Sequence, residues 1–149
     1  AAGHQGMAGG QAIDLAGVGQ VLTQSHLEDM HRRKTGALLL ASVRMGAMAV
    51  QASATQMQAL QRYGQALGLA FQVIDDVLDV TADSATLGKT AGKDAAADKP
   101  TFVSLMGLDP ARQYAFDLLD QAHAALDEAQ LSTTDTLRHV ANWVVDRTH

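Results

Sequence analysis

Apolar residues recur at three- and four-residue spacing along most of the chain, a pattern typical of helices that bury one face. The first such stripe predicts a helix that begins near Ser25, because Ser25 and Glu28 have the spacing of a capping box. Lys34 lies on the same stripe, where a lysine is costly to bury unless its charge reaches water or an anion. The apolar members of the stripe are Leu27, Met30, Leu38, Ala41, Met45 and Met48.

A second stripe predicts a longer helix, which begins at another capping box formed by Ser53 and Gln56. Its apolar positions are Met57, Leu60, Gly64, Leu67, Phe71, Ile74 and Leu78. A polar row lies beside this stripe within an arc of about 100° on the helix surface, and it consists of Gln72, Asp75, Asp76 and Asp79. A hydrated surface is the ordinary explanation of an acidic row. Such a surface usually carries lysines as well, and residues 35–88 contain none.

The segments around these two helices differ in composition. Residues 3–15 are rich in glycine and fit either a helix of small residues or a flexible loop. Residues 16–24 have the character of a short linker, and residues 81–100 have the composition of a loop. A short helix is expected over residues 101–108.

Two further helices are predicted in the last third of the chain. Asp109 is the expected N-cap and Pro110 the first residue of a helix that continues to about Gln130. A last helix begins near Thr134, and its expected inward residues are Leu137, Val140, Ala141, Val144 and Val145. The whole pattern predicts an all-α fold, a single helical bundle without an internal repeat.

Composition supports this fold class and excludes several functions. The 149 residues suit one domain, and they are 47% hydrophobic but only 4% aromatic, which is a helical profile. No cysteine is present, which excludes disulfides and thiolate chemistry. The net charge of −5 argues against a nucleic-acid partner, and no apolar run is long enough for a membrane span. Because the first residues lack the features of a signal peptide, we expect a cytoplasmic protein.

The three aspartates of the polar row form the pattern D-D-x-x-D, which suits a hard cation such as Mg²⁺. Magnesium commonly joins one or two carboxylates to phosphate oxygens, and nearby lysines neutralise the remaining phosphate charge. Three of the four lysines, Lys89, Lys93 and Lys99, follow the aspartates in the predicted loop. Spacing alone leaves two interpretations open, a magnesium–phosphate site and a hydrated helix surface.

Three strings occur in order along the chain: GMAGGQAIDL, HRRKTGAL and GLAFQVIDDVLDVTADSATLGKTAGKD. Together they closely resemble the C-terminal half of the bacterial short-chain isoprenyl diphosphate synthases, among which the farnesyl diphosphate synthases are nearest. The resemblance extends from Gly3 to the final helix. It implies that residues 1–149 are the C-terminal portion of a single all-helical isoprenoid synthase domain, whose N-terminal half lies outside this sequence.

The resemblance implies a role for each residue that matches a family motif. Lys34 and Thr35 match the K-T pair, in which the lysine contacts the allylic diphosphate and the threonine dipole faces the forming carbocation. Gln72 matches the glutamine of the F-Q pair, which lies beside the same substrate. Lys89 and Lys99 resemble the lysines that bind diphosphate after the aspartate motif.

The aspartates and the glycine-rich segment also match family motifs. Asp75, Asp76 and Asp79 resemble the second aspartate-rich motif, in which the first aspartate ligates Mg²⁺ and the others support the metal cluster. Gln11 and Asp14 match G-G-Q-x-x-D, which lines the cavity and supports the lysine.

The implied activity is a prenyl transfer that synthesises geranyl or farnesyl diphosphate. An allylic diphosphate ionises, the double bond of isopentenyl diphosphate attacks the carbocation, and a proton leaves. The resemblance further implies Mg²⁺ as the cofactor, the two diphosphates as partners and a homodimer. We expect the chain alone to be inactive, because the family's other aspartate-rich motif lies in the N-terminal half. A non-catalytic or regulatory diphosphate-binding homologue and a plain helical interaction domain remain open as alternatives.

Overall fold

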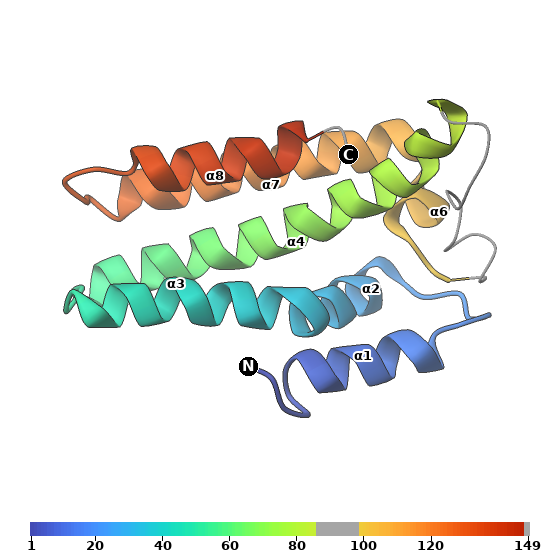
Figure 1. The fold of residues 1–149 in the computed structure, drawn as a ribbon, viewed down its shortest axis with the longest axis horizontal. Helices are drawn as coiled ribbons and strands as arrows, with labels where there is room; N and C mark the ends of the chain where they lie inside the picture. The colour runs from blue at the N-terminus through green and yellow to red at the C-terminus, as the bar shows by residue number, and fades with distance from the viewer. Residues whose placement is uncertain (86–98, 148–149) are drawn as a thin grey trace.

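The computed structural model describes the backbone of residues 1–85 and 99–147 and the side chains of residues 1–81 and 99–147. All the regular structure of these residues is helical, which confirms the predicted all-α fold (Figure 1). The elements are α1 (Met7–Ala16), α2 (Gln24–His31), the π-helical turn η1 (Arg32–Gly36), α3 (Ala37–Ala49), α4 (Ala54–Ala85), α6 (Phe102–Met106), α7 (Leu108–Glu128) and α8 (Asp135–Asp146).

Helix α4 runs through the middle of the molecule and supplies most of the core. Helices α2 and α3 follow each other through η1 along one side of α4, with α1 outside them, and α7 and α8 cover the other side (Figure 1). The apolar stripe predicted for α4 is confirmed, because its members are buried or partly buried. Residues of α4 that pack against α2, α6, α7 or α8 include Leu60, Tyr63, Leu67, Leu69, Val73, Ile74 and Val77.

One of the two predicted capping boxes is confirmed and the other is wrong. The Ser53 backbone N–H donates to Gln56 Oε1 (2.9 Å) and the Gln56 N–H donates to Ser53 Oγ (3.2 Å), as the sequence predicted. The N-cap of α2 is Thr23 instead of Ser25, because extended backbone at Thr23 lets its hydroxyl accept from the His26 N–H. Glu28 makes contacts outside its own helix instead of capping it.

Two predicted boundaries near the acidic helix are also corrected. Helix α4 continues past Thr81, where the sequence predicted a loop, and the Thr81 hydroxyl donates to the Val77 carbonyl within the helix (2.9 Å). Helix α7 begins after Gly107, whose φ of +90° ends the preceding segment, so Asp109 lies in the first turn instead of at the N-cap. The short helix before it and the last helix form as predicted.

The first apolar stripe is buried only in its first half. Leu27 and Met30 are buried in the core, whereas Leu38, Met45 and Met48 are 42%, 64% and 64% exposed. The π-helical turn between them is the physical reason, since one extra residue per turn rotates all later positions of the helix by about 100°.

The side of α3 that packs on α4 consequently carries other residues, Leu40, Val43 and Ala47. Val140 was likewise predicted to point inward and is exposed on α8. Among the residues described, no helix has the length and apolar character that crossing a bilayer requires.

Candidate active site

Two glycines allow the backbone of the π-helical turn to approach its neighbours closely. A Cβ atom on Gly10 of α1 would lie 2.2 Å from the backbone nitrogen of Lys34, so only glycine fits there. A Cβ atom on Gly68 of α4 would lie 2.8 Å from Gly36 Cα. The turn that carries the K-T pair is therefore held between α1 and α4 by direct backbone contact.

Lys34 forms an ion pair with a buried carboxylate of α1. Its Nζ lies 2.7 Å from Asp14 Oδ2, and Asp14 is only 5% exposed. A buried carboxylate is costly without a partner, so this pair fixes the position of Lys34. Gln11, the other residue matched to the same motif, lies on the exposed side of α1.

Thr35 and Gln72 connect the π-helical turn to the acidic helix. The Thr35 hydroxyl donates a hydrogen bond to Gln72 Oε1 (2.5 Å), and Gln72 is buried. Because the amide oxygen accepts this bond, the amide NH₂ of Gln72 keeps both its donors for other partners. The structure thus joins the threonine to the glutamine, whereas the lysine next to this threonine pairs with Asp14 of α1. We refer to Lys34, Thr35 and Gln72 together as the polar cluster.

The three aspartates follow Gln72 on α4 but have different surroundings. Asp75 is exposed, Asp79 is half-buried, and Asp76 is buried, where its Oδ2 accepts the Phe102 backbone N–H at the start of α6 (2.7 Å). Asp76 therefore anchors α6, while Asp75 and Asp79 lie on the helix face that begins at Gln72.

These side chains fit a divalent cation in part. Within the described ranges, no three His, Asp or Glu side chains converge as a metal site. Asp75 and Asp79 are four residues apart on one helix face and supply oxygen ligands, and magnesium usually takes only one or two carboxylates from a protein. The donor chemistry of this pair suits Mg²⁺ when phosphate oxygens and water complete the shell.

Sequence reasoning did not find Arg147, which lies beside the aspartates. Its Nη2 is 3.3 Å from Asp75 Oδ1 and donates to the Phe71 carbonyl (2.9 Å). Arg147 and Asp75 are 72 positions apart in the sequence. The apolar pattern of α8 shows only which side of that helix is buried, so it does not predict this ion pair.

The structure describes only one of the two lysines assigned to the loop. Lys89 lies outside the described residues. Lys99 borders a groove between the linker at Val21 and the start of α6, and the residues that line it include neither Lys34 nor Gln72. Their expected roles in diphosphate binding stay predictions.

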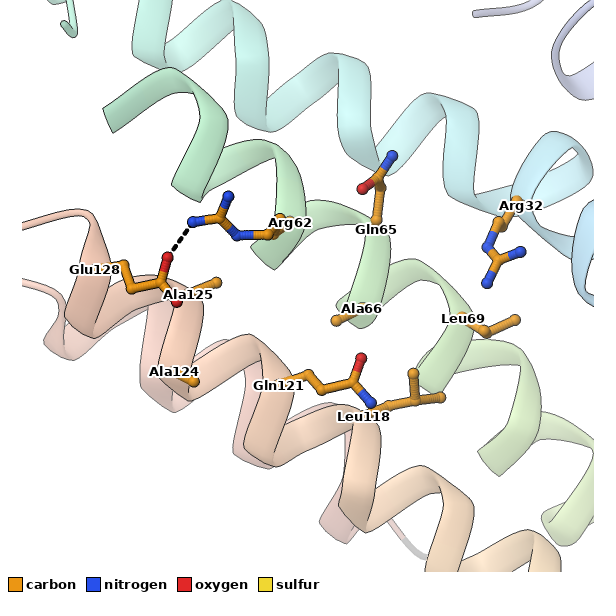
Figure 2. Close-up of a pocket in the computed structure, with 10 residues that line it drawn as sticks. All are labelled: Arg32, Arg62, Gln65, Ala66, Leu69, Leu118, Gln121, Ala124, Ala125 and Glu128. Carbon is orange, nitrogen blue, oxygen red and sulfur yellow. Dashed lines mark hydrogen bonds and ion pairs between the residues drawn. The ribbon is translucent and has the colours of Figure 1, made fainter. Parts of the chain in front are cut away.

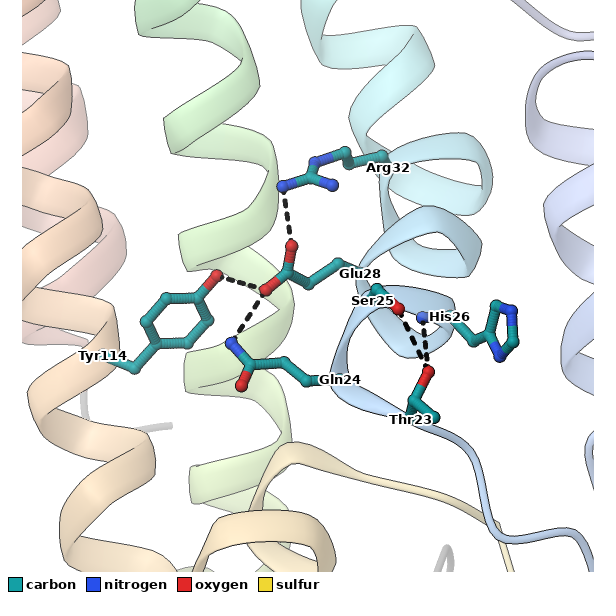
Figure 3. Close-up of polar contacts among 7 residues, drawn as sticks. All are labelled: Thr23, Gln24, Ser25, His26, Glu28, Arg32 and Tyr114. Carbon is teal, nitrogen blue, oxygen red and sulfur yellow. Dashed lines mark hydrogen bonds and ion pairs between the residues drawn. The ribbon is translucent and has the colours of Figure 1, made fainter.

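A polar network on α2 holds the helix that leads into the π-helical turn. The Tyr114 hydroxyl of α7 donates to Glu28 Oε1 (2.7 Å), Gln24 donates to the same oxygen, and Arg32 pairs with Oε2 (2.8 Å) (Figure 3). Burial raises the pKa of Glu28, but the hydrogen bonds and the Arg32 charge outweigh it and bring the pKa below its ordinary value. Burial and the contact with Glu28 raise the pKa of Tyr114 to about 12.

A groove lies away from the polar cluster, between α4 and α7. It has a volume of about 570 Å³, and Figure 2 shows Arg32 at one end and the Arg62–Glu128 ion pair at the other. Both arginines are paired with glutamates, and the groove includes none of the site residues predicted from the sequence. We therefore place the candidate active site at the π-helical turn and the acidic end of α4.

This combination, an all-helical fold with a lysine-bearing turn against an aspartate-rich helix, matches known proteins over nearly its whole length. Residues 3–137 match the family model described as Polyprenyl synthetase. The chain is 56% identical over 126 residues to the "Probable farnesyl diphosphate synthase" of Sinorhizobium fredii, and it is 43% identical over 150 residues to the farnesyl diphosphate synthase of Escherichia coli.

A solved structure agrees with these relatives. The geranyltransferase of Helicobacter pylori, complexed with magnesium and isoprenyl diphosphate, is 31% identical with a TM-score of 0.73. The match covers 95% of this chain and 46% of that one.

The chain belongs to the polyprenyl synthetase family. The matches cover 82% of this chain and 38% of the Sinorhizobium protein, and 99% of this chain and 50% of the Escherichia protein. The chain therefore spans half or less of the length of these relatives.

Proposed function

We propose that this chain is the C-terminal half of a prenyl diphosphate synthase of the farnesyl diphosphate synthase type. The complete protein would condense an allylic diphosphate with isopentenyl diphosphate through a carbocation and release pyrophosphate. The single observation that carries this proposal is the hydrogen bond from Thr35 of the π-helical turn to Gln72 of α4, beside a lysine, Lys34, whose position is set by its ion pair with Asp14. Neither a plain interaction domain nor a hydrated helix surface needs this polar cluster.

Each residue of the cluster has a task in this reaction. Lys34 is anchored by Asp14 and presents a fixed positive charge to the leaving diphosphate, a preorganised contribution that strengthens as charge develops. The Thr35 hydroxyl donates its hydrogen bond to Gln72, so the lone pairs on its oxygen remain available to stabilise a nearby carbocation. The Gln72 NH₂ donors hold a diphosphate oxygen.

We further propose that Asp75 and Asp79 hold Mg²⁺ at the diphosphate. When bound, magnesium supplies Lewis-acid neutralisation of the charge that develops on the leaving group. Asp76 supports them by fixing the start of α6 through the Phe102 amide. A homodimer and a cytoplasmic location are also part of this proposal, and they rest on the family resemblance and on the water-soluble character of diphosphate substrates.

A chimeric enzyme tests the proposed function directly. Residues 1–149 replace the matching C-terminal half of the Escherichia coli farnesyl diphosphate synthase, which is 43% identical over 150 residues. We expect the chimera to convert an allylic diphosphate and isopentenyl diphosphate to a longer prenyl diphosphate. Lys34→Ala and Asp75→Ala should each lower kcat by about a hundredfold or more, because each removes charge stabilisation from the transition state.

Two controls separate this function from its alternatives. Arg62→Ala breaks an exposed ion pair in the groove between α4 and α7 and should leave the activity unchanged. The 149-residue chain on its own should show no turnover, since half of the family domain is missing. A folded chimera that binds allylic diphosphate without turnover would instead support a non-catalytic homologue, and one that binds no diphosphate would contradict the site altogether.

A further inference from the structure

The C-terminal end of α8 is joined to the acidic helix by one arginine. Arg147 follows the last residue of α8, and its Nη2 donates to the Phe71 carbonyl (2.9 Å) and to Asp75 Oδ1 (3.3 Å). Its guanidinium also lies over the Phe71 ring, 4.0 Å from the ring centre. The side chain of Arg147 is 12% exposed, whereas that of Asp75 is 57% exposed.

These contacts fix the guanidinium without using all its hydrogen-bonding capacity. A planar cation stacked on an aromatic ring loses its side-chain freedom once and then reaches both oxygen acceptors with little further ordering. Arg147 Nε, however, is buried and has no hydrogen-bond partner among the residues described. The hydrogen bond to Asp75 is the longer of the two that Arg147 Nη2 makes, and the Asp75 side chain is exposed, so this is the contact that a competing cation can replace.

We propose that Arg147 is the internal counter-ion of Asp75 and competes with the divalent cation for its carboxylate. This inference rests on the proposed function, because it takes Asp75 as a cation ligand. Arg147 Nη2 already contacts Oδ1 of the carboxylate that the cation would bind, and Coulomb repulsion opposes the close approach of the two positive charges. Cation binding therefore displaces Arg147 from Asp75 and loosens the last turn of α8.

Direct measurement of cation affinity tests this competition. Free Mn²⁺ is counted by electron paramagnetic resonance while the 149-residue chain is titrated in the absence of diphosphate. Arg147→Ala should bind Mn²⁺ about three- to fivefold more tightly than the wild type, since a partly exposed ion pair is worth up to about that factor. The gain should disappear when Asp75→Asn is also present. Arg147→Lys keeps the charge but loses the stacked plane, so its affinity should fall between the two.

A matched control and a second measurement guard against general effects. Arg138→Ala removes the same charge from α8 itself, where Arg138 pairs with Asp127, and should change the affinity by less than about twofold. Trp143, the single tryptophan, lies on α8 four residues before Arg147. Its emission should change as Mg²⁺ saturates the wild-type chain but not the Arg147→Ala chain. Circular dichroism checks that every variant is helical.

The outcomes separate this inference from the proposed function. If Arg147→Ala binds Mn²⁺ no better than the wild type while Asp75→Asn loses binding, Asp75 is a ligand and the counter-ion role of Arg147 is wrong. If neither the wild type nor Arg147→Ala binds Mn²⁺, removing the competitor exposes no site and the counter-ion role is wrong, whereas the proposed function is decided separately by the turnover of the chimera.

Discussion

At the scale of single residues, the candidate site depends on glycines, which have no side chain, as much as on its polar residues. Gly10 and Gly68 let two helices touch the backbone of the π-helical turn, and this contact positions Lys34 and Thr35. Gly46 of α3 is different, because a Cβ atom there would meet nothing within 4 Å. The three glycines look alike in the sequence, but only the first two are required by packing.

This contrast gives a prediction with an internal control. Gly10→Ala should destabilise the fold by about 1–3 kcal/mol, because the added methyl overlaps the Lys34 backbone and forces α1 away. Gly46→Ala should instead stabilise it by about 0.5–1 kcal/mol, since alanine is the better helix former and the space is open. Urea unfolding of both variants measures the difference. Equal effects would show that α1 does not pack this closely on the turn.

At the scale of elements, Glu28 joins α2, the helix that leads into the π-helical turn, to α7 through its hydrogen bond with Tyr114. Its pKa is lower in the folded chain than the ordinary value of 4.5. A carboxylate of this kind stabilises the fold fully above its unfolded pKa, and the contribution is lost as the pH falls through the folded pKa. The network therefore matters most near neutral pH and least in acid.

Glu28→Gln should consequently lower the free energy of unfolding by about 1–2 kcal/mol at pH 7, because it weakens charged hydrogen bonds from Tyr114 and Arg32. The difference from the wild type should shrink as the pH falls below about 4.5. Glu128→Gln makes the same chemical change at an exposed ion pair and should cost less than about 0.5 kcal/mol. Urea unfolding across pH measures all three chains, and a difference that persists in acid would contradict the assignment.

Helical periodicity was enough to predict most elements, and local motifs were enough to single out Lys34, Thr35 and Gln72, of which the structure joins the last two by a hydrogen bond. What the sequence could not show is where a helix changes its phase. The π-helical turn has no distinctive composition, yet its extra residue turned Met45 and Met48 outward. Arg147 was missed for a related reason, because its partner is set by how α8 packs on α4 rather than by any local pattern.

At the scale of the whole molecule, α3 presents an apolar face that nothing in the described chain covers. We call this the α3 face, and it consists of Leu38, Met45 and Met48. Apolar patches of neighbouring residues on a protein surface usually mark contact with another polypeptide. The chain spans half or less of the length of these relatives, which therefore have further residues that a contact of this kind can use.

When the 149-residue chain is alone, a second copy is the remaining partner, and we expect it to self-associate as concentration rises. Combining Met45→Gln with Met48→Gln should shift the association to higher concentration, because about 25 cal/mol is lost per Å² of apolar surface no longer buried. Val21→Gln is the control, since Val21 is 99% exposed in the linker away from the α3 face. Sedimentation velocity over a wide concentration range measures the shift. A wild-type chain that stays monomeric throughout would show that this face needs no partner, and an equal shift in both variants would show that general hydrophobicity, not the α3 face, drives association.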